Sequence, residues 1–182
     1  TNARIDSRWT SGEQGQGTLS GQVGWAPLDV DLQLRGSALP VNVEPYAQLQ
    51  VAPDLAITLR DNNLHVGGEL AIPEGDIRVR ELPASAVTVS PDVVIVGQEA
   101  AEQEAALGIT ARVKLNIGDQ LRLSAFGLRG RLKGQLEVQE NLTANGDLQI
   151  LDGEFRRLGQ ELKLRRALLL FSGPISQPYL NV

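Results

Sequence analysis

Apolar and polar residues alternate one by one along most of this chain. In the clearest stretch, Val113, Leu115 and Ile117 are separated by single polar residues, and Leu121 and Leu123 continue the rhythm. Successive side chains of a β-strand point to opposite faces, so a period of two predicts strands with one apolar and one polar face. Similar runs occur at 28–34, 55–59, 70–72, 77–79, 136–138, 148–150 and 162–164. The pattern predicts an all-β chain of about a dozen strands.

Short polar and glycine dipeptides interrupt these runs. Gly118-Asp119 separates two alternating stretches, so we expect residues 112–125 to form a hairpin around it. By the same reasoning, turns are expected at Asn62-Asn63, Glu74-Gly75, Asn145-Gly146, Asp152-Gly153 and Leu158-Gly159.

An internal repeat accompanies the turn signals. Residues 68–77 and 146–155 share the order Gly, acid, Leu, any, Ile, any, acid, Gly, acid, apolar. We interpret the repeat as one sheet grown by successive hairpins, in which the glycines allow tight reversals.

A large one-sided sheet must cover its apolar face with a second sheet, by closure, or by curling into a trough. Only 4% of the residues are aromatic, whereas sandwich cores generally contain bulky aromatic side chains. An aliphatic lining suits either a packed core, which is the default, or an open apolar groove.

The chain lacks the residues that several classes of catalytic and metal sites require. The chain has no cysteine and one histidine, His65, which lies on the polar side of the alternation. Zinc–thiolate sites and cysteine nucleophiles are therefore excluded, and no Gly-x-Ser-x-Gly elbow is present. The net charge of −5 argues against nucleic acid as a partner. We expect no enzyme activity and no cofactor.

Charged clusters have ordinary surface explanations. Asp29 and Asp31 share one strand face, and Glu99, Glu102 and Glu104 cluster in a polar stretch, but neither group has calcium-loop spacing. We expect no metal site. Arg129, Arg131 and Lys133 alternate along one strand, which indicates a polar face first and a patch for an anionic headgroup or partner second.

The chain is interpreted as one curved-sheet domain, residues 1–182, excised from a larger chain. It does not begin with methionine, and it ends inside an alternating stretch. Residues 83–108 are expected to form a mobile loop insertion, because alanine and glutamate dominate positions 98–107 and the alternation stops there.

Two segments in the C-terminal half resemble the TamB family. Residues 124–134 (SAFGLRGRLKG) are similar to one family segment, and residues 169–174 (LLFSGP), followed by 177–182 (QPYLNV), are similar to another. The resemblance covers residues 64–182. It implies one long, strongly curved, mostly antiparallel sheet folded into a U-shaped trough, a β-taco with an apolar interior. A closed β-sandwich or jelly-roll binding module without a groove is the alternative.

The resemblance also implies a function. TamB proteins are periplasmic subunits of the translocation and assembly module, anchored in the inner membrane of Gram-negative bacteria, and their partner is the outer-membrane barrel TamA. The family implies autotransporter assembly, phospholipid transport between the two membranes, or both. The cargo would be phospholipid acyl chains or unfolded outer-membrane protein strands.

The alternation identifies the apolar groove residues that would contact lipid or protein strands. They are Leu70, Ile72, Ile77, Val79, Val113, Leu115, Ile117, Leu121, Leu123, Leu136, Val138, Leu148, Ile150, Leu162 and Leu164.

Overall fold

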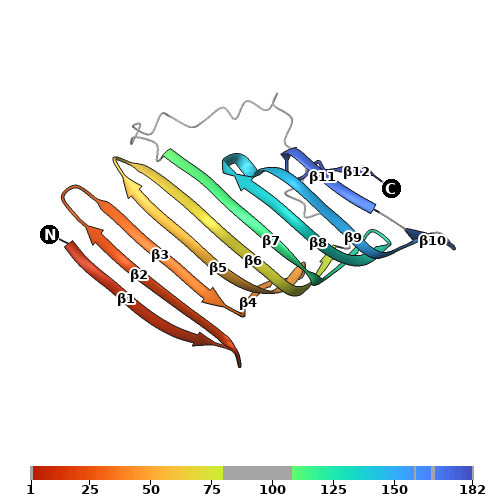
Figure 1. The fold of residues 1–182 in the computed structure, drawn as a ribbon, viewed down its shortest axis with the longest axis horizontal. Coiled ribbons are helices and arrows are strands. Elements are labelled where there is room, and N and C mark those ends of the chain that lie inside the picture. Colours follow the sequence, from red (N-terminus) through yellow and green to blue (C-terminus); the bar gives the residue numbers. More distant parts are fainter. Residues whose placement is uncertain (1, 80–107, 158, 165–166, 182) are drawn as a thin grey trace, which may run out of the picture.

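All strands that the structure describes belong to one open, curved sheet (Figure 1). The computed structural model describes residues 2–79, 108–157, 159–164 and 167–181. The strands are β1 (Asn2–Ser11), β2 (Gly15–Gly24), β3 (Asp29–Ser37), β4 (Leu39–Val43), β5 (Ala47–Arg60), β6 (Asn63–Val79), β7 (Gly108–Ala125), β8 (Leu128–Gln139), β9 (Thr143–Arg157), β10 (Gln160–Leu164), β11 (Ala167–Pro174) and β12 (Tyr179–Asn181). The predicted all-β trough is confirmed, and the sandwich alternative is wrong because no second sheet is present among the described strands.

The strand order is β1-β2-β3-β5-β6-β7-β8-β9-β11-β12, with β4 paired to β5 and β10 paired to β9. Every pair of described strands is antiparallel except β6–β7, which is parallel. The sheet is therefore mostly antiparallel, as expected. Residues 80–107 connect the two parallel strands. The predicted insertion at 83–108 lies outside the described residues, apart from Gly108, which begins β7.

The predicted hairpin around Gly118-Asp119 is wrong. Strand β7 runs without reversal from Gly108 to Ala125, and these residues form an irregularity where its pairing with β8 shifts between Ile117 and Leu121. A Cβ at Gly118 would lie only 2.7 Å from the carbonyl oxygen of Pro73 in β6. Glycine is needed there because two backbones approach closely and not because the chain turns.

The turns predicted at Glu74-Gly75, Asn145-Gly146 and Asp152-Gly153 are also wrong, because the chain does not reverse at these positions. All three dipeptides lie inside the long strands β6 and β9. Pairing shifts occur beside the first and the last of them, between Ile72 and Glu74 and opposite Arg129–Arg131. The chain does turn close to the predicted Asn62-Asn63, where Asp61 and Asn62 have φ of 48° and 62°.

The internal repeat encodes a bend in a long strand and does not encode a hairpin. Gly68 in β6 and Gly146 in β9 open the two copies, with φ of 130° and 133°. A Cβ at either position would lie 2.2–2.3 Å from a carbonyl oxygen of the neighbouring strand. Glycine kinks and bulges are the devices that curve a sheet, and each copy carries a kink followed by an irregularity.

The buried residues follow the bend across the sheet. Leu121 is 1% exposed and Ile150 is 3% exposed, although they belong to a single layer. The cluster draws one residue from each of six neighbouring strands: Val51, Ile72, Leu121, Leu132, Ile150 and Ala167. Half-buried Leu39 of β4 and Leu164 of β10 pack against it. Such burial within one sheet requires that the sheet fold over its own apolar face.

Candidate functional site: an apolar trough

The fifteen predicted groove residues lie on one face of the sheet, which we call the apolar face. Strand pairing places them in rows that cross the strands. Leu70 is paired with Leu115, which is paired with Leu136. Ile72 is paired with Ile117, and Ile77 with Leu123. Val113 is paired with Val138. Because each row joins apolar residues of neighbouring strands, the alternation of single strands becomes a continuous surface.

The remaining predicted residues extend these rows. Leu121 is in register with Leu132, which is paired with Ile150 of β9. Leu148 is paired with Gly134 and Leu169. At the end of the sheet, Val79 starts a row that reaches Leu162 through Ala125, Leu128 and Phe155, and Leu164 lies opposite Gly153.

The solvent exposure of these fifteen side chains increases with distance from the bend. Five of the predicted residues are buried: Ile72, Leu121, Leu136, Leu148 and Ile150. Leu162 is 56% exposed, and the other nine are half-buried. The floor of the trough is therefore packed by its own side chains, whereas the flanks present partly accessible apolar surface.

The apolar face is larger than the predicted set. It continues through the N-terminal half, where Leu32 of β3 is paired with Ile57 of β5, which is paired with Val66 of β6. The alternation at 28–34 and 55–59 already contained this signal. Ala144, which is fully buried, and Ala167 were missed because alanine contributes little to an apolar pattern.

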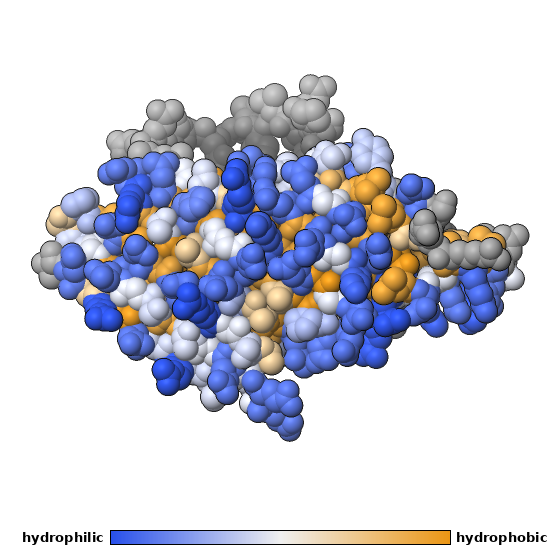
Figure 2. All heavy atoms as spheres, viewed as in Figure 1, coloured by the Kyte–Doolittle hydropathy of each residue, from blue (hydrophilic) through white to orange (hydrophobic). Residues whose placement is uncertain are grey.

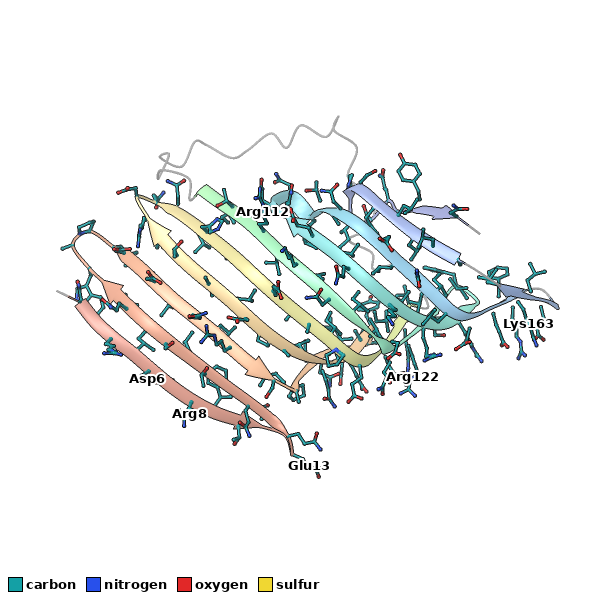
Figure 3. The ribbon with its side chains drawn as sticks, in the orientation of Figure 1. Asp6, Arg8, Glu13, Arg112, Arg122 and Lys163 are labelled. Atoms are coloured by element: carbon teal, nitrogen blue, oxygen red, sulfur yellow. The ribbon has the colours of Figure 1, made fainter. Side chains whose placement is uncertain are left out.

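The opposite face is polar and solvated. On this face Arg122 donates two hydrogen bonds of 2.8 Å to the Asp76 carboxylate, and Arg131 donates to Asp152. The hydrogen bonds from Arg122 hold the pKa of the Asp76 carboxyl below its usual value. Figure 2 shows hydrophilic side chains over most of the visible surface, and Figure 3 places Arg112 and Arg122 near opposite ends of β7. The sheet is thus amphipathic through its thickness.

A depression of about 690 Å³ is lined by residues of strands β4 to β8. Its lining includes Gln48, Gln50, Glu74, Gln120 and Arg131. Pro40, Val41 and Leu49 also line it, so the depression is mixed in character, unlike the aliphatic rows of the trough.

The residues considered for catalysis or metal binding lie on the solvent-exposed surface, where the structure describes them. His65 is exposed on the polar face, as predicted, with Nδ1 2.9 Å from the hydroxyl oxygen of Thr110. Asp29 and Asp31 lie 3.5 and 3.7 Å from the Arg60 guanidinium. Glu99, Glu102 and Glu104 lie outside the described residues. In the described part of the chain, no group of three or more His, Asp or Glu side chains could hold a metal ion.

The described residues contain no helix of the length and apolarity required to cross a membrane.

Comparison with known proteins extends the resemblance. A sequence model of the TamB C-terminal domain matches residues 6–182, further toward the N-terminus than the segment resemblance over 64–182. The translocation and assembly module subunit TamB of Haemophilus influenzae is 29% identical over an alignment that covers 90% of this chain. The chain spans only 14% of that relative's length.

Proposed function

The chain belongs to the TamB C-terminal domain family, and from this premise we propose that its apolar face is a non-enzymatic trough that shelters phospholipid acyl chains. In this proposal the trough moves lipid between the inner and outer membranes of a Gram-negative envelope. The protein would act in the periplasm as part of an inner-membrane-anchored chain. Residues 1–182 would form one curved-sheet domain of that chain.

One observation carries the proposal. Apolar side chains, interrupted at places by glycine, run in rows across the sheet, and the described strands provide no second layer to cover the flanks. Burying apolar surface is favourable, so a half-exposed aliphatic face of this size gains free energy from an apolar occupant.

The dimensions of the trough suit an acyl chain. Strand β7 has 18 residues, and a rise of ~3.3 Å per residue gives a path of roughly 60 Å. Folding at the bend leaves flanks of about 25–30 Å, longer than the ~15 Å of one leaflet's hydrocarbon. A phospholipid tail therefore fits against one flank without leaving the apolar face.

The name of the Haemophilus relative supports a place in the translocation and assembly module. We propose that the full-length protein works with the outer-membrane barrel TamA, and that it assists the assembly of autotransporters and other outer-membrane proteins. Delivery of lipid to the site of barrel insertion would connect the two activities.

Unfolded outer-membrane protein strands are a second candidate cargo, and the sheet edge favours them. Strand β1 is ten residues long and pairs only with β2 among the described strands. Its free edge exposes backbone groups to which an extended segment can add, while the apolar face receives alternate side chains.

Site-specific photo-crosslinking in cells separates these cargoes. A photoreactive residue replaces Leu115 or Leu123 on the apolar face of the full-length protein, and the matched controls carry it at Lys114 or Ser124 on the polar face of the same strand. We expect phospholipid adducts from the first pair only. Adducts with nascent outer-membrane protein alone would favour the second candidate, and equal capture from both faces would contradict both.

A further inference from the structure

Along one edge of the sheet, where the strands end, free cations lie beside exposed apolar side chains. We propose that this edge, formed by the ends of β6, β7, β8, β9 and β10, docks on the surface of an anionic lipid membrane. We call it the basic edge and define it by Arg78, Phe126, Arg129, Leu162 and Lys163. The proposed function concerns cargo inside the trough, whereas this inference concerns the surface on which the protein rests.

Strand pairing brings the cations together. Arg78 is in register with Ser124, which is paired with Arg129, and Glu154 is paired with both Arg129 and Lys163. Three cations and one carboxylate thus form a single row across five strands on the polar face. The neighbouring row, from Val79 to Leu162, is apolar and faces the trough. The edge is therefore cationic on one side and apolar on the other.

The cations of this row are available to a ligand. Arg122, Arg131 and Arg156 are engaged by Asp76, Asp152 and Glu161 respectively. By contrast, Arg78, Arg129 and Lys163 are exposed and form no ion pair with any described residue. Glu154, the one acid in the row, lies 3.9 Å from Arg156.

Apolar side chains protrude at the tips of the same edge. Phe126, in the turn between β7 and β8, is 51% exposed, and Leu162 in β10 is 56% exposed. The β9–β10 hairpin projects beyond the rest of the sheet (Figure 1), and Lys163 lies on it (Figure 3). A hollow of about 290 Å³ lined by Arg78, Val79, Ser124, Phe126 and Gly127 joins a guanidinium to an aromatic ring. An anionic headgroup beside hydrocarbon presents the complementary chemistry.

The opposite edge shows that charge, and not apolar exposure, distinguishes the basic edge. Leu28 and Leu142 are exposed there by 56% and 69%. The acids near them, Asp29, Asp31, Asp61, Glu137 and Glu140, outnumber the cations Arg4, Arg60 and Arg112 at that edge. This excess of acid makes the edge less suited to an anionic membrane than the basic edge, where the row of three cations contains one acid.

Vesicle sedimentation of the 182-residue chain tests the proposal. The probes are phosphatidylcholine vesicles and phosphatidylcholine vesicles that contain phosphatidylglycerol. We expect binding to the anionic vesicles only. Because each surface cation contributes about fivefold to such binding, Arg129→Gln with Lys163→Gln should weaken it about 25-fold. Phe126→Ser with Leu162→Ser should also weaken it, through the loss of apolar contact.

The matched control removes the same charge from mid-sheet. Lys114→Gln with Lys133→Gln deletes two exposed cations that form no ion pair with a described residue and lie away from the basic edge, and it should retain most of the binding. The exchange Arg129→Lys with Lys163→Arg should bind as the wild type does, which shows that charge and not folding is responsible. Equal losses in the edge and mid-sheet variants would overturn the proposal, and so would absence of wild-type binding to anionic vesicles.

Discussion

Arg122 donates two hydrogen bonds to the carboxylate of Asp76, of 2.8 Å from Nε to Oδ1 and 2.8 Å from Nη2 to Oδ2. The two residues lie 46 positions apart in the chain and join β6 to β7, the one parallel pair among the described strands. Charge-assisted bidentate hydrogen bonds of this kind are stronger and more specific in geometry than single neutral ones, so the pair helps to fix the register of that junction.

The ion pair predicts a pH dependence of stability. Hydrogen bonds from Arg122 lower the pKa of Asp76 in the folded protein, so the unfolded chain binds a proton at that site more readily. The stabilisation is present above the usual pKa of 3.8 and is lost as pH falls through the lower folded value. We expect Asp76→Asn to reduce the free energy of unfolding at neutral pH by only about 0.5–1 kcal/mol, because the pair is partly solvated.

Urea unfolding at several pH values checks this expectation. The difference between wild type and Asp76→Asn should shrink as the pH approaches 3 or below. Glu69→Gln, an exposed carboxylate of the same strand without an ion pair to a described residue, is the control and should show little effect at any pH. A constant difference over the whole range would mean that the charge of Asp76 is not the cause.

The gradient of burial predicts different responses to a charge on the floor and on the flank of the trough. Leu121 is 1% exposed, so Leu121→Asp places an unpaired carboxylate among aliphatic side chains and should cost several kcal/mol, enough to unfold the domain. Leu115 is half-buried on the flank, where water can reach a new carboxylate, and Leu115→Asp should stay folded with a modestly lower Tm.

Thermal unfolding followed by circular dichroism, together with lipid crosslinking, distinguishes the two cases. The flank variant should lose lipid adducts while it remains folded. If Leu115→Asp unfolds as completely as Leu121→Asp, the flank is a closed core and the proposed trough fails.

The kink at Gly68 predicts a strong preference for glycine. Its φ of 130° is strained for other residues, and a Cβ would lie 2.2 Å from the Asp54 carbonyl oxygen. We expect Gly68→Ala to lower the free energy of unfolding by about 2–3 kcal/mol.

The neighbouring Gly67 is a matched control. A Cβ there would come nearest to the movable His65 ring, at 3.2 Å from Nε2, and its φ is not positive. Gly67→Ala should change stability by less than about 1 kcal/mol. Similar losses from both alanine variants in chemical denaturation would show that Gly68 has no special role in the bend.

The side of the sheet on which each apolar residue lies was predictable from the sequence, whereas contact of these residues with a cargo stays a prediction. Each predicted residue, from Leu70 to Leu164, is placed by the alternation of its own strand, and that alternation needs no knowledge of the neighbours. The trough shape of the sheet was predicted from the family resemblance. Composition alone favoured a packed core, because it contains no information about how many sheets share the apolar residues.

The length of the strands was not predictable in the same way. A dipeptide of glycine and an acidic residue can occur where the chain reverses and also where a strand only bends. Gly118-Asp119 and Asp152-Gly153 are of the second kind, and the dipeptide alone does not distinguish the two. The outcome depends on which backbone lies opposite, and for Gly118 that is Pro73, far away in the sequence. Similarly, no local feature reveals that β6 and β7 run parallel.

The sequence by itself determined which side chains share a face and therefore that the sheet is amphipathic, since side-chain alternation is a property of each extended segment alone. The tertiary structure decided where the sheet bends, which apolar residues the bend buries and which it leaves accessible. Those features arise from register offsets and close backbone approaches between strands that are distant along the chain, and such relationships exist only once the strands have paired.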